Sequence, residues 1–234
     1  LNSPSTTTNT RTDTRFKDAA MNVFDALSQR TSVNYFDTER AISTAEVLEL
    51  LDYAQHAPTA FNIQHTRYLV VTDQAAKETL KDIAYGQQKV ADAPVVILVL
   101  ADEQGHERMP DIAQRGVDAG IYNEGVRDYF VSAVNGAYGD NKAAAHDEAL
   151  RSASMATMNL MTAAAGKGMA TGPMIGFDTA KAKEVFNIGE RYSVAMMVTL
   201  GYAKEGNWPR KPRLAASEVT VLDGRPGKLH DLSN

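Results

Sequence analysis

Cysteine is absent from this sequence of 234 residues. Its absence excludes disulfides, thiolate nucleophiles and the zinc or iron–sulfur sites that depend on cysteine. Any redox chemistry must therefore come from a bound organic cofactor or from a metal held by other ligands. The resulting absence of disulfides fits a cytoplasmic protein, and we expect the protein to act in the cytoplasm.

Long apolar runs and an excess of positive charge are also missing. The longest purely apolar run, Ala93 to Ala101, suits a buried strand and is far shorter than the roughly 20 residues of a membrane helix. The net charge is -5, whereas a nucleic-acid binder usually has a basic face. We therefore expect neither a membrane nor a nucleic acid as a partner. Residues 1–14 are rich in Ser, Thr and Asn, which predicts a disordered tail.

Helical signals occur along much of the chain, and the clearest long helix is expected over residues 143–167. Apolar residues from Phe16 onward predict a first helix that ends near Gln29. Ser43 and Glu46 form a capping-box motif, which predicts the start of a helix that ends near Pro58. Further helices are expected after Asp73, over residues 143–167 and after Asp178. Residues 103–142 are expected to contain one or two helices and a mobile connection at residues 135–141.

Strands are expected at residues 68–72, 94–100 and 194–202, which are short and rich in β-branched or aliphatic side chains. Residues 218–222 could add an edge strand, and residues 168–177 read as a glycine-rich loop. Helices precede and separate the strands, which favours an α+β fold with a central sheet wrapped by helices. We expect residues 15–222 to form one domain, followed by a tail at 223–234.

Four regions far apart in the sequence carry the candidate chemistry. Residues 30–34 place an arginine and hydroxyls after a helix end, where they could bind a phosphate. Residues 57–65 offer side-chain amides to a flat heterocycle, and residues 86–89 offer an amide and a lysine. The fourth region combines the glycine-rich residues 172–177, which allow close backbone approach, with the basic run 209–214. Taken alone, each region is a weak signal, and an ordinary loop or helix end is the commoner explanation for residues 30–34, 57–65 and 86–89.

Taken in order, these regions resemble the FMN-dependent nitroreductase family over roughly residues 22–222. The matching stretches are Arg-x-Ser-Val from Arg30, Ala-Pro-Thr-Ala-Phe-Asn-Ile-Gln from Ala57, Asp-Ala-Pro from Asp92, Met-Ala-x-Met-Asn-Leu-Met from Met155, Gly-Pro-Met-Ile-Gly-Phe-Asp from Gly172 and Lys-Pro-Arg-Leu from Lys211. The sequence departs from common family patterns at three positions. Many members carry a basic residue in place of Asn34, a proline commonly stands in place of His65, and some members carry a glutamate in place of Ile175.

The resemblance implies a nitroreductase-like fold, with a mostly antiparallel sheet, in an intertwined homodimer that holds FMN at the subunit interface. It implies NADH or NADPH as the electron donor and no metal. The FMN-binding residues that it implies are Arg30, Thr31, Ser32, Asn34, Gln87, Lys89, Pro173, Met174, Ile175, Gly176, Lys211 and Arg213, together with Pro58 and, from the partner chain, Thr59, Ala60, Asn62 and Gln64.

The same resemblance implies a ping-pong cycle in which a hydride passes from NAD(P)H to flavin N5 and the electrons then pass to an acceptor. Nitroaromatics, quinones or similar electron-poor molecules are the expected acceptors, and no catalytic side chain is obligatory. Residues 103–142 would shape the acceptor pocket. The candidate pocket residues are Phe61, Tyr122, Tyr129 and Tyr138.

Two other interpretations remain open. A quinone or enone reductase on the same scaffold would differ only in the shape of its pocket. A non-catalytic, flavin-binding regulatory dimer would bind FMN without oxidising NAD(P)H. A metalloenzyme is disfavoured because the 5 histidines show no spacing typical of metal ligands.

Overall fold

A four-stranded antiparallel sheet forms the centre of the molecule, in the strand order β1-β2-β4-β3. The computed structural model describes residues 21–222. The strands are β1 (Thr66–Val71), β2 (Val95–Asp102), β3 (Ala170–Met174) and β4 (Tyr192–Gly201). Every residue of β2 is buried, as predicted for the continuous aliphatic run in this part of the sequence.

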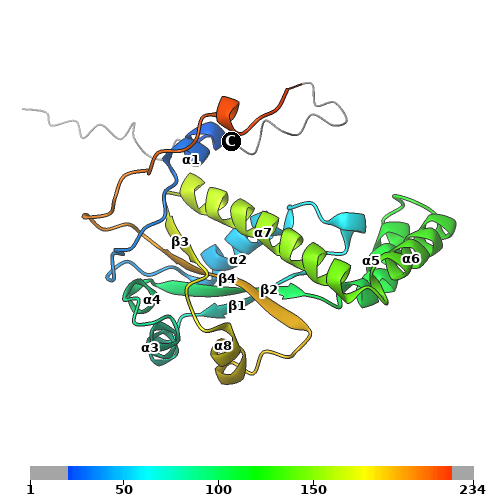
Figure 1. Ribbon diagram of the computed structural model, residues 1–234, viewed down its shortest axis with the longest axis horizontal. Helices are drawn as coiled ribbons and strands as arrows, with labels where there is room; N and C mark the ends of the chain where they lie inside the picture. Colours follow the sequence, from blue (N-terminus) through cyan, green and yellow to red (C-terminus); the bar gives the residue numbers. More distant parts are fainter. Residues whose placement is uncertain (1–20, 223–234) are drawn as a thin grey trace, which may run out of the picture.

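Side chains of β2 alternate between two hydrophobic clusters, one on each face of the sheet. Val95, Ile97 and Val99 pack with α2 (Thr44–Gln55) and α7 (Lys142–Gly166). Val96 and Leu98 pack on the opposite face with α3 (Gln74–Ile83), α4 (Lys89–Asp92) and α8 (Thr179–Val185). Figure 1 shows α7 along one side of the sheet and α3, α4 and α8 on the other. The fold is therefore α+β with helices on both faces, as the sequence predicts.

The remaining α-helices lie near opposite ends of the long helix α7 (Figure 1). Helix α1 (Val23–Gln29) packs near the end of α7, and the pair α5 (Met109–Asp118) and α6 (Glu124–Tyr138) projects beyond its start (Figure 1). Three short 3-10 helices complete the described structure: η2 (Ala60–Asn62), η3 (Gly105–Arg108) and η4 (Ala216–Glu218). Within residues 21–222, no helix has the length and apolarity needed to cross a membrane.

The predicted capping box at the start of α2 is confirmed. The Glu46 backbone N–H donates to Ser43 Oγ at 3.2 Å, and the Ser43 backbone N–H donates to Glu46 Oε2 at 2.8 Å. Replacing Ser43 with alanine is expected to lower the free energy of unfolding by about 1 kcal/mol, because the Glu46 N–H loses its acceptor. Denaturant unfolding would measure this change. Replacement of its exposed neighbour Thr44 with alanine should have almost no effect, and equal losses in both variants would contradict the assignment.

Three predictions about local structure were wrong. Residues 170–174, expected in a loop, form β3, and Pro173 is tolerated because β3 is an edge strand. Helix α6 continues to Tyr138, so the expected connection at 135–141 is mostly helical. The possible edge strand at residues 218–222 is not formed: Glu218 belongs to η4, and residues 219–222 pair with no strand of the sheet within the described residues. The start of the first predicted helix, at Phe16, and both predicted tails lie outside the described residues.

Candidate functional site

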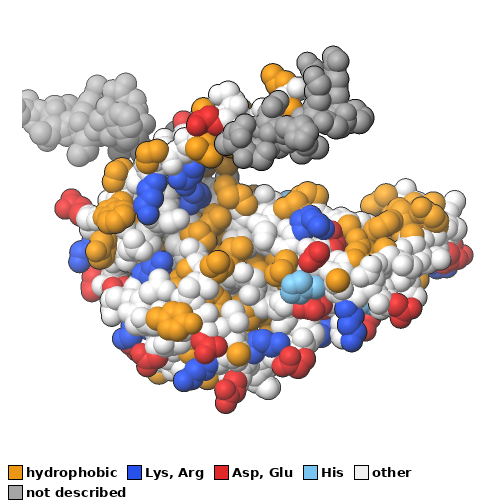
Figure 2. All heavy atoms as spheres, viewed as in Figure 1, with side chains coloured by type: hydrophobic (Ala, Val, Ile, Leu, Met, Phe, Trp, Pro, Cys, Tyr) orange, Lys and Arg blue, Asp and Glu red, His pale blue; other side chains and the backbone are white. Residues whose placement is uncertain are grey.

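The first and last motifs of the sequence meet in one pocket of about 250 Å³. This basic pocket is lined by Arg30, Thr31, Ser32, Asn34, Trp208, Pro209, Arg210, Lys211 and Arg213. Four of these side chains carry a positive charge, and none of the nine carries a negative one. On the face shown in Figure 2, basic side chains gather next to α1. The pocket therefore has the charge needed to bind an anion.

Arg30 is the strongest sign that an anion belongs in the basic pocket. Its Nε and Nη1 atoms are buried and have no hydrogen-bond partner within the described residues. Burial lowers the pKa of the Arg30 guanidinium, and the nearby charges of Arg210 and Arg213 lower it further. Buried donors without partners are costly, and a phosphate dianion would satisfy them while offsetting the repulsion between the guanidinium groups. The residues present thus fit a phosphate.

Asn207 holds the two walls of the basic pocket together. Its Oδ1 atom accepts hydrogen bonds from the backbone N–H groups of Asn34, at 2.7 Å, and Tyr35, at 3.1 Å. Its Nδ2 atom donates to the carbonyl oxygens of Tyr35 and Lys204. One side-chain amide therefore joins the segment after α1 to the chain that follows β4, residues 202–222, which we call the C-terminal arm. Sequence reasoning missed Asn207, since nothing in its local sequence indicates a partner 172 residues away.

Arg210 anchors the same arm to the end of α1. It donates to the carbonyl oxygens of Ser28 (2.9 Å), Leu27 (2.6 Å) and Arg30 (2.6 Å). These are carbonyls that a helix end leaves without intrahelical partners. Three backbone oxygens thus occupy the Arg210 guanidinium. Arg213 uses only Nη1 on the backbone, where it donates to the carbonyl oxygens of Lys211 at 3.0 Å and Pro212 at 3.2 Å. Lys211 and the remaining donors of Arg213 are therefore the candidates for binding an anion, as the sequence predicts.

Gly172 allows strand β3 to approach the wall of the basic pocket. A Cβ atom at this position would lie 2.5 Å from Thr199 Oγ1 and 2.8 Å from the Val33 carbonyl oxygen. The Val33 backbone N–H donates to the Thr171 carbonyl at 3.1 Å, so this contact fixes the segment that carries Ser32 and Asn34. The glycine-rich segment was predicted to allow close backbone approach to a ligand, whereas at Gly172 the structure shows close approach to another segment of the same chain.

Replacing Gly172 with alanine is expected to weaken, about tenfold, the binding of the FMN that the family resemblance implies, because the added methyl group must push residues 31–34 away from β3. Titration of apoprotein with FMN, followed by flavin fluorescence, would measure the change. Gly189 provides a matched control, since a Cβ there meets its nearest neighbour at 4.0 Å. Unchanged FMN affinity in the Gly172 variant would show that this approach does not shape the pocket.

A second group of predicted residues lies next to residues 175–176, which directly follow β3. Gln87 Nε2 donates to the Gly176 carbonyl at 2.8 Å and to the Ala84 carbonyl at 3.2 Å, so residues predicted from two separate motifs lie together. Ile175 is exposed, with 76% of its surface accessible. Lys89 is half-buried, and this burial lowers the pKa of its ammonium group. A ligand with an anionic end and a flat polar end could extend along β3 between the basic pocket and this group.

The loop at residues 58–64 does not join these groups within one chain. Phe61 contacts Phe130 of α6, with ring centroids 6.2 Å apart, and Figure 1 shows η2 near α5 and α6, away from α1 and α4. The loop has an unusual backbone: Phe61, Asn62 and Gln64 have φ angles of 49°, 59° and 57°, in the left-handed region. The structure therefore shows two separated parts of the predicted site, one at each end of the chain fold.

Aromatic side chains surround Phe130 on α6. Tyr122 and Tyr129 lie 5.5 Å and 5.9 Å from it, measured between ring centroids. Gly116 of α5 makes room for the Tyr122 ring, because a Cβ atom there would lie 2.2 Å from the Tyr122 hydroxyl oxygen. Three of the four predicted pocket aromatics, Phe61 included, thus form one cluster around Phe130. The fourth, Tyr138, instead faces the buried ring of His65 at 6.5 Å.

Comparison with known proteins connects these features to one family. The model of the Nitroreductase family matches residues 27–202. MhqN of Bacillus subtilis, which carries a provisional NAD(P)H nitroreductase name, is 38% identical over 189 residues, covering 80% of this chain and 90% of its own. Protein DrgA of Synechocystis is 36% identical over 185 residues, covering 79% and 86%.

Solved structures show the same fold. A crystal structure of the provisionally assigned nitroreductase ydfN from Bacillus subtilis is 36% identical, with a TM-score of 0.81, covering 84% of this chain and 96% of that one. A provisionally assigned nitroreductase from Exiguobacterium sibiricum, crystallised in complex with FMN, is 28% identical, with a TM-score of 0.82 and coverages of 88% and 99%.

Proposed function

Because this chain belongs to the nitroreductase family, we propose that it is an FMN-dependent oxidoreductase that takes electrons from NAD(P)H and delivers them to a small electron-poor acceptor. The observation that best supports the cofactor is the pair of buried donor atoms of Arg30, which have no partner within the described residues and lie in a pocket shared with Lys211 and Arg213. The FMN complex of the relative from Exiguobacterium sibiricum supports the same cofactor.

The chain's own residues would bind the cofactor and compensate its charge. FMN, when bound, supplies hydride acceptance from NAD(P)H at N5 and electron delivery to the acceptor. Arg30, Lys211 and Arg213 would hold the phosphate, and the positive charge of Lys89 would favour an electron-rich ring. Gln87 would fix the backbone of residues 175–176 through its bond to the Gly176 carbonyl.

The proposal includes a homodimer in which each chain completes the site of the other. Its support is the separation of the basic pocket from the loop at residues 58–64, both of which the family motif assigns to FMN. A second copy would also cover the exposed apolar side chains of α1, α2 and α7, since contiguous apolar surface commonly marks an interface. These side chains are Val23, Phe24, Leu27, Leu48, Tyr53 and Met158.

The acceptor would bind near the aromatic cluster around Phe130. Flat nitroaromatics and quinones can stack on aromatic side chains such as Phe61, Tyr122 and Tyr129. Phe61 connects this cluster to the loop proposed to contact FMN, because it belongs to η2 and contacts Phe130. The acceptor and the flavin would therefore share one edge of the site.

Initial rates of NADH and NADPH oxidation by the FMN-saturated protein test this function. Menadione serves as the quinone probe and 4-nitrobenzoate as the nitroaromatic probe. We expect turnover with at least one probe and parallel double-reciprocal lines, because a ping-pong cycle releases NAD(P)+ before the acceptor binds. Tight FMN binding without oxidation of either nucleotide would contradict the enzymatic proposal and favour a non-catalytic flavin-binding protein.

A further inference from the structure

The loop at residues 59–64 must be held in place by its surroundings. Three of its residues, Phe61, Asn62 and Gln64, have the left-handed φ angles that residues other than glycine rarely adopt. Such conformations persist only where neighbouring contacts fix them, and they cluster at ligand sites. Within the loop, the Gln64 backbone N–H donates to Thr59 Oγ1 at 3.0 Å, and Gln64 Nε2 donates to the Asn62 carbonyl at 3.2 Å. These internal bonds do not connect the loop to the sheet.

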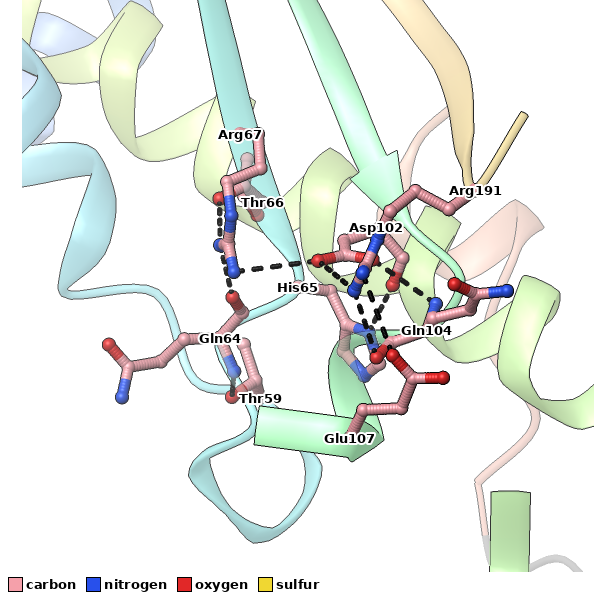
Figure 3. A network of polar contacts seen from close by, with 9 residues as sticks. All are labelled: Thr59, Gln64, His65, Thr66, Arg67, Asp102, Gln104, Glu107 and Arg191. Atoms are coloured by element: carbon pink, nitrogen blue, oxygen red, sulfur yellow. Dashed lines mark hydrogen bonds and ion pairs between the residues drawn. The ribbon is translucent and has the colours of Figure 1, made fainter. Parts of the chain in front are cut away.

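Arg67 makes that connection from the start of β1. Its Nη1 atom donates to the carbonyl oxygens of Gln64 and Thr66, each at 2.7 Å (Figure 3). Its Nη2 atom lies 3.5 Å from Asp102 Oδ2, at the end of the neighbouring strand β2. The guanidinium therefore joins the last residue of the left-handed loop to a carboxylate on the central strand.

Asp102 is a fixed anchor for this connection because its carboxylate is completely buried. Arg191, just before β4, binds it through two donors, with Nε 2.8 Å from Oδ1 and Nη2 3.0 Å from Oδ2. The Gln104 backbone N–H also donates to Oδ1, at 3.2 Å. Figure 3 shows the two arginines approaching the same carboxylate, Arg67 from β1 and Arg191 from the turn just before β4. A bidentate arginine pair fixes the carboxylate more rigidly than a single contact would.

We propose that Arg67, held by Asp102, is a positioning residue that fixes loop 59–64 in the conformation that presents Asn62 and Gln64 to the flavin. The cofactor part of this inference rests on the proposed function. Arg67 acts through the loop backbone and belongs to no motif of the family resemblance. Arg191 serves the same carboxylate but makes no hydrogen bond to residues 59–64 in the described structure.

The matched pair R67M and R191M tests the inference, because each variant removes one arginine from Asp102 and only R67M removes the bonds to the Gln64 and Thr66 carbonyls. We expect R67M to weaken FMN binding at least tenfold and R191M to weaken it less than threefold. The two variants should lose similar amounts of thermal stability. The conservative variant R67K should fall between R67M and the wild type, since one ammonium group cannot reproduce the planar fork. FMN affinity would be measured by fluorescence titration of the dimeric apoprotein.

Amide hydrogen exchange of residues 59–66 without FMN provides the second measurement. Faster exchange in R67M than in R191M is expected. Equal exchange, or equal FMN affinities for the two variants, would overturn the role of Arg67. A wild-type protein that binds no FMN would overturn the proposed function, and the exchange comparison would still decide whether Arg67 fixes the loop.

Discussion

Replacing Lys211 and Arg213 together with alanine is expected to weaken FMN binding by about 100-fold. Each residue offers a charged donor to the phosphate, and such a bond contributes about 1.5 kcal/mol at a partly exposed site, so the two losses add to roughly 3 kcal/mol. Turnover of the FMN-saturated variant should change much less, because neither residue is assigned to the reacting end of the cofactor. Fluorescence titration of apoprotein measures the affinity, and steady-state rates at saturating FMN measure the chemistry.

A double variant with the same change in net charge provides the control. Lys142, at the start of α7, and Lys181, on α8, are exposed and do not line the basic pocket. Their replacement with alanine should leave FMN affinity within a factor of about two at physiological ionic strength, where exposed charges beyond about 8 Å are screened. If the Lys211 and Arg213 double variant bound FMN as tightly as the wild type, the phosphate site would lie elsewhere.

Replacing Asp102 with asparagine is expected to lower the free energy of unfolding by about 3 kcal/mol. The substitution keeps the size of the side chain but leaves Arg67 and Arg191 without their shared, fully buried counter-charge. Removing one partner of a buried ion pair costs about 3–5 kcal/mol, and the lower end applies because both guanidinium groups are partly exposed. For a domain of this size, the expected decrease in melting temperature is roughly 6–12 °C.

Asp128 offers the matched comparison for this effect. It pairs with Arg127 at 2.8 Å, but its side chain is 67% exposed. Its replacement with asparagine should change the stability by less than about 0.5 kcal/mol, since exposed ion pairs contribute little. Both melting temperatures must be measured at the same FMN concentration, because ligand binding stabilises the folded state. Equal melting temperatures for the two variants would contradict the importance of the buried carboxylate.

Local sequence signals were sufficient to predict most of the sheet and its covering helices. The aliphatic run of β2, the capping box before α2 and the cap at Asp73 all act over a few residues, and each is present. Strand β3 was missed because Gly172 and Pro173 are poor strand formers in isolation, and the edge position that tolerates them depends on β4. Residues 219–222 carry a plausible strand pattern but find no partner in the described part of one chain.

The candidate site shows the same division between local and distant information. Family motifs identified Arg30, Lys211 and Arg213, and the structure brings all three into one pocket. Asn207 was missed, as was the ion-pair network of Asp102, because each depends on contacts between residues far apart in the sequence. A buried carboxylate at the end of a hydrophobic strand was the one available signal for the network, since such a group needs charged partners.

The most direct test of the central claim is the visible absorption spectrum of the FMN-reconstituted protein under anaerobic conditions, recorded before and after addition of NADH or NADPH. We predict a protein-bound oxidised-flavin spectrum that bleaches when one of the nucleotides is added and recovers when menadione follows. Protein that retains no flavin after gel filtration would contradict the cofactor assignment. Bound flavin that never bleaches with either nucleotide would contradict the proposed oxidoreductase activity.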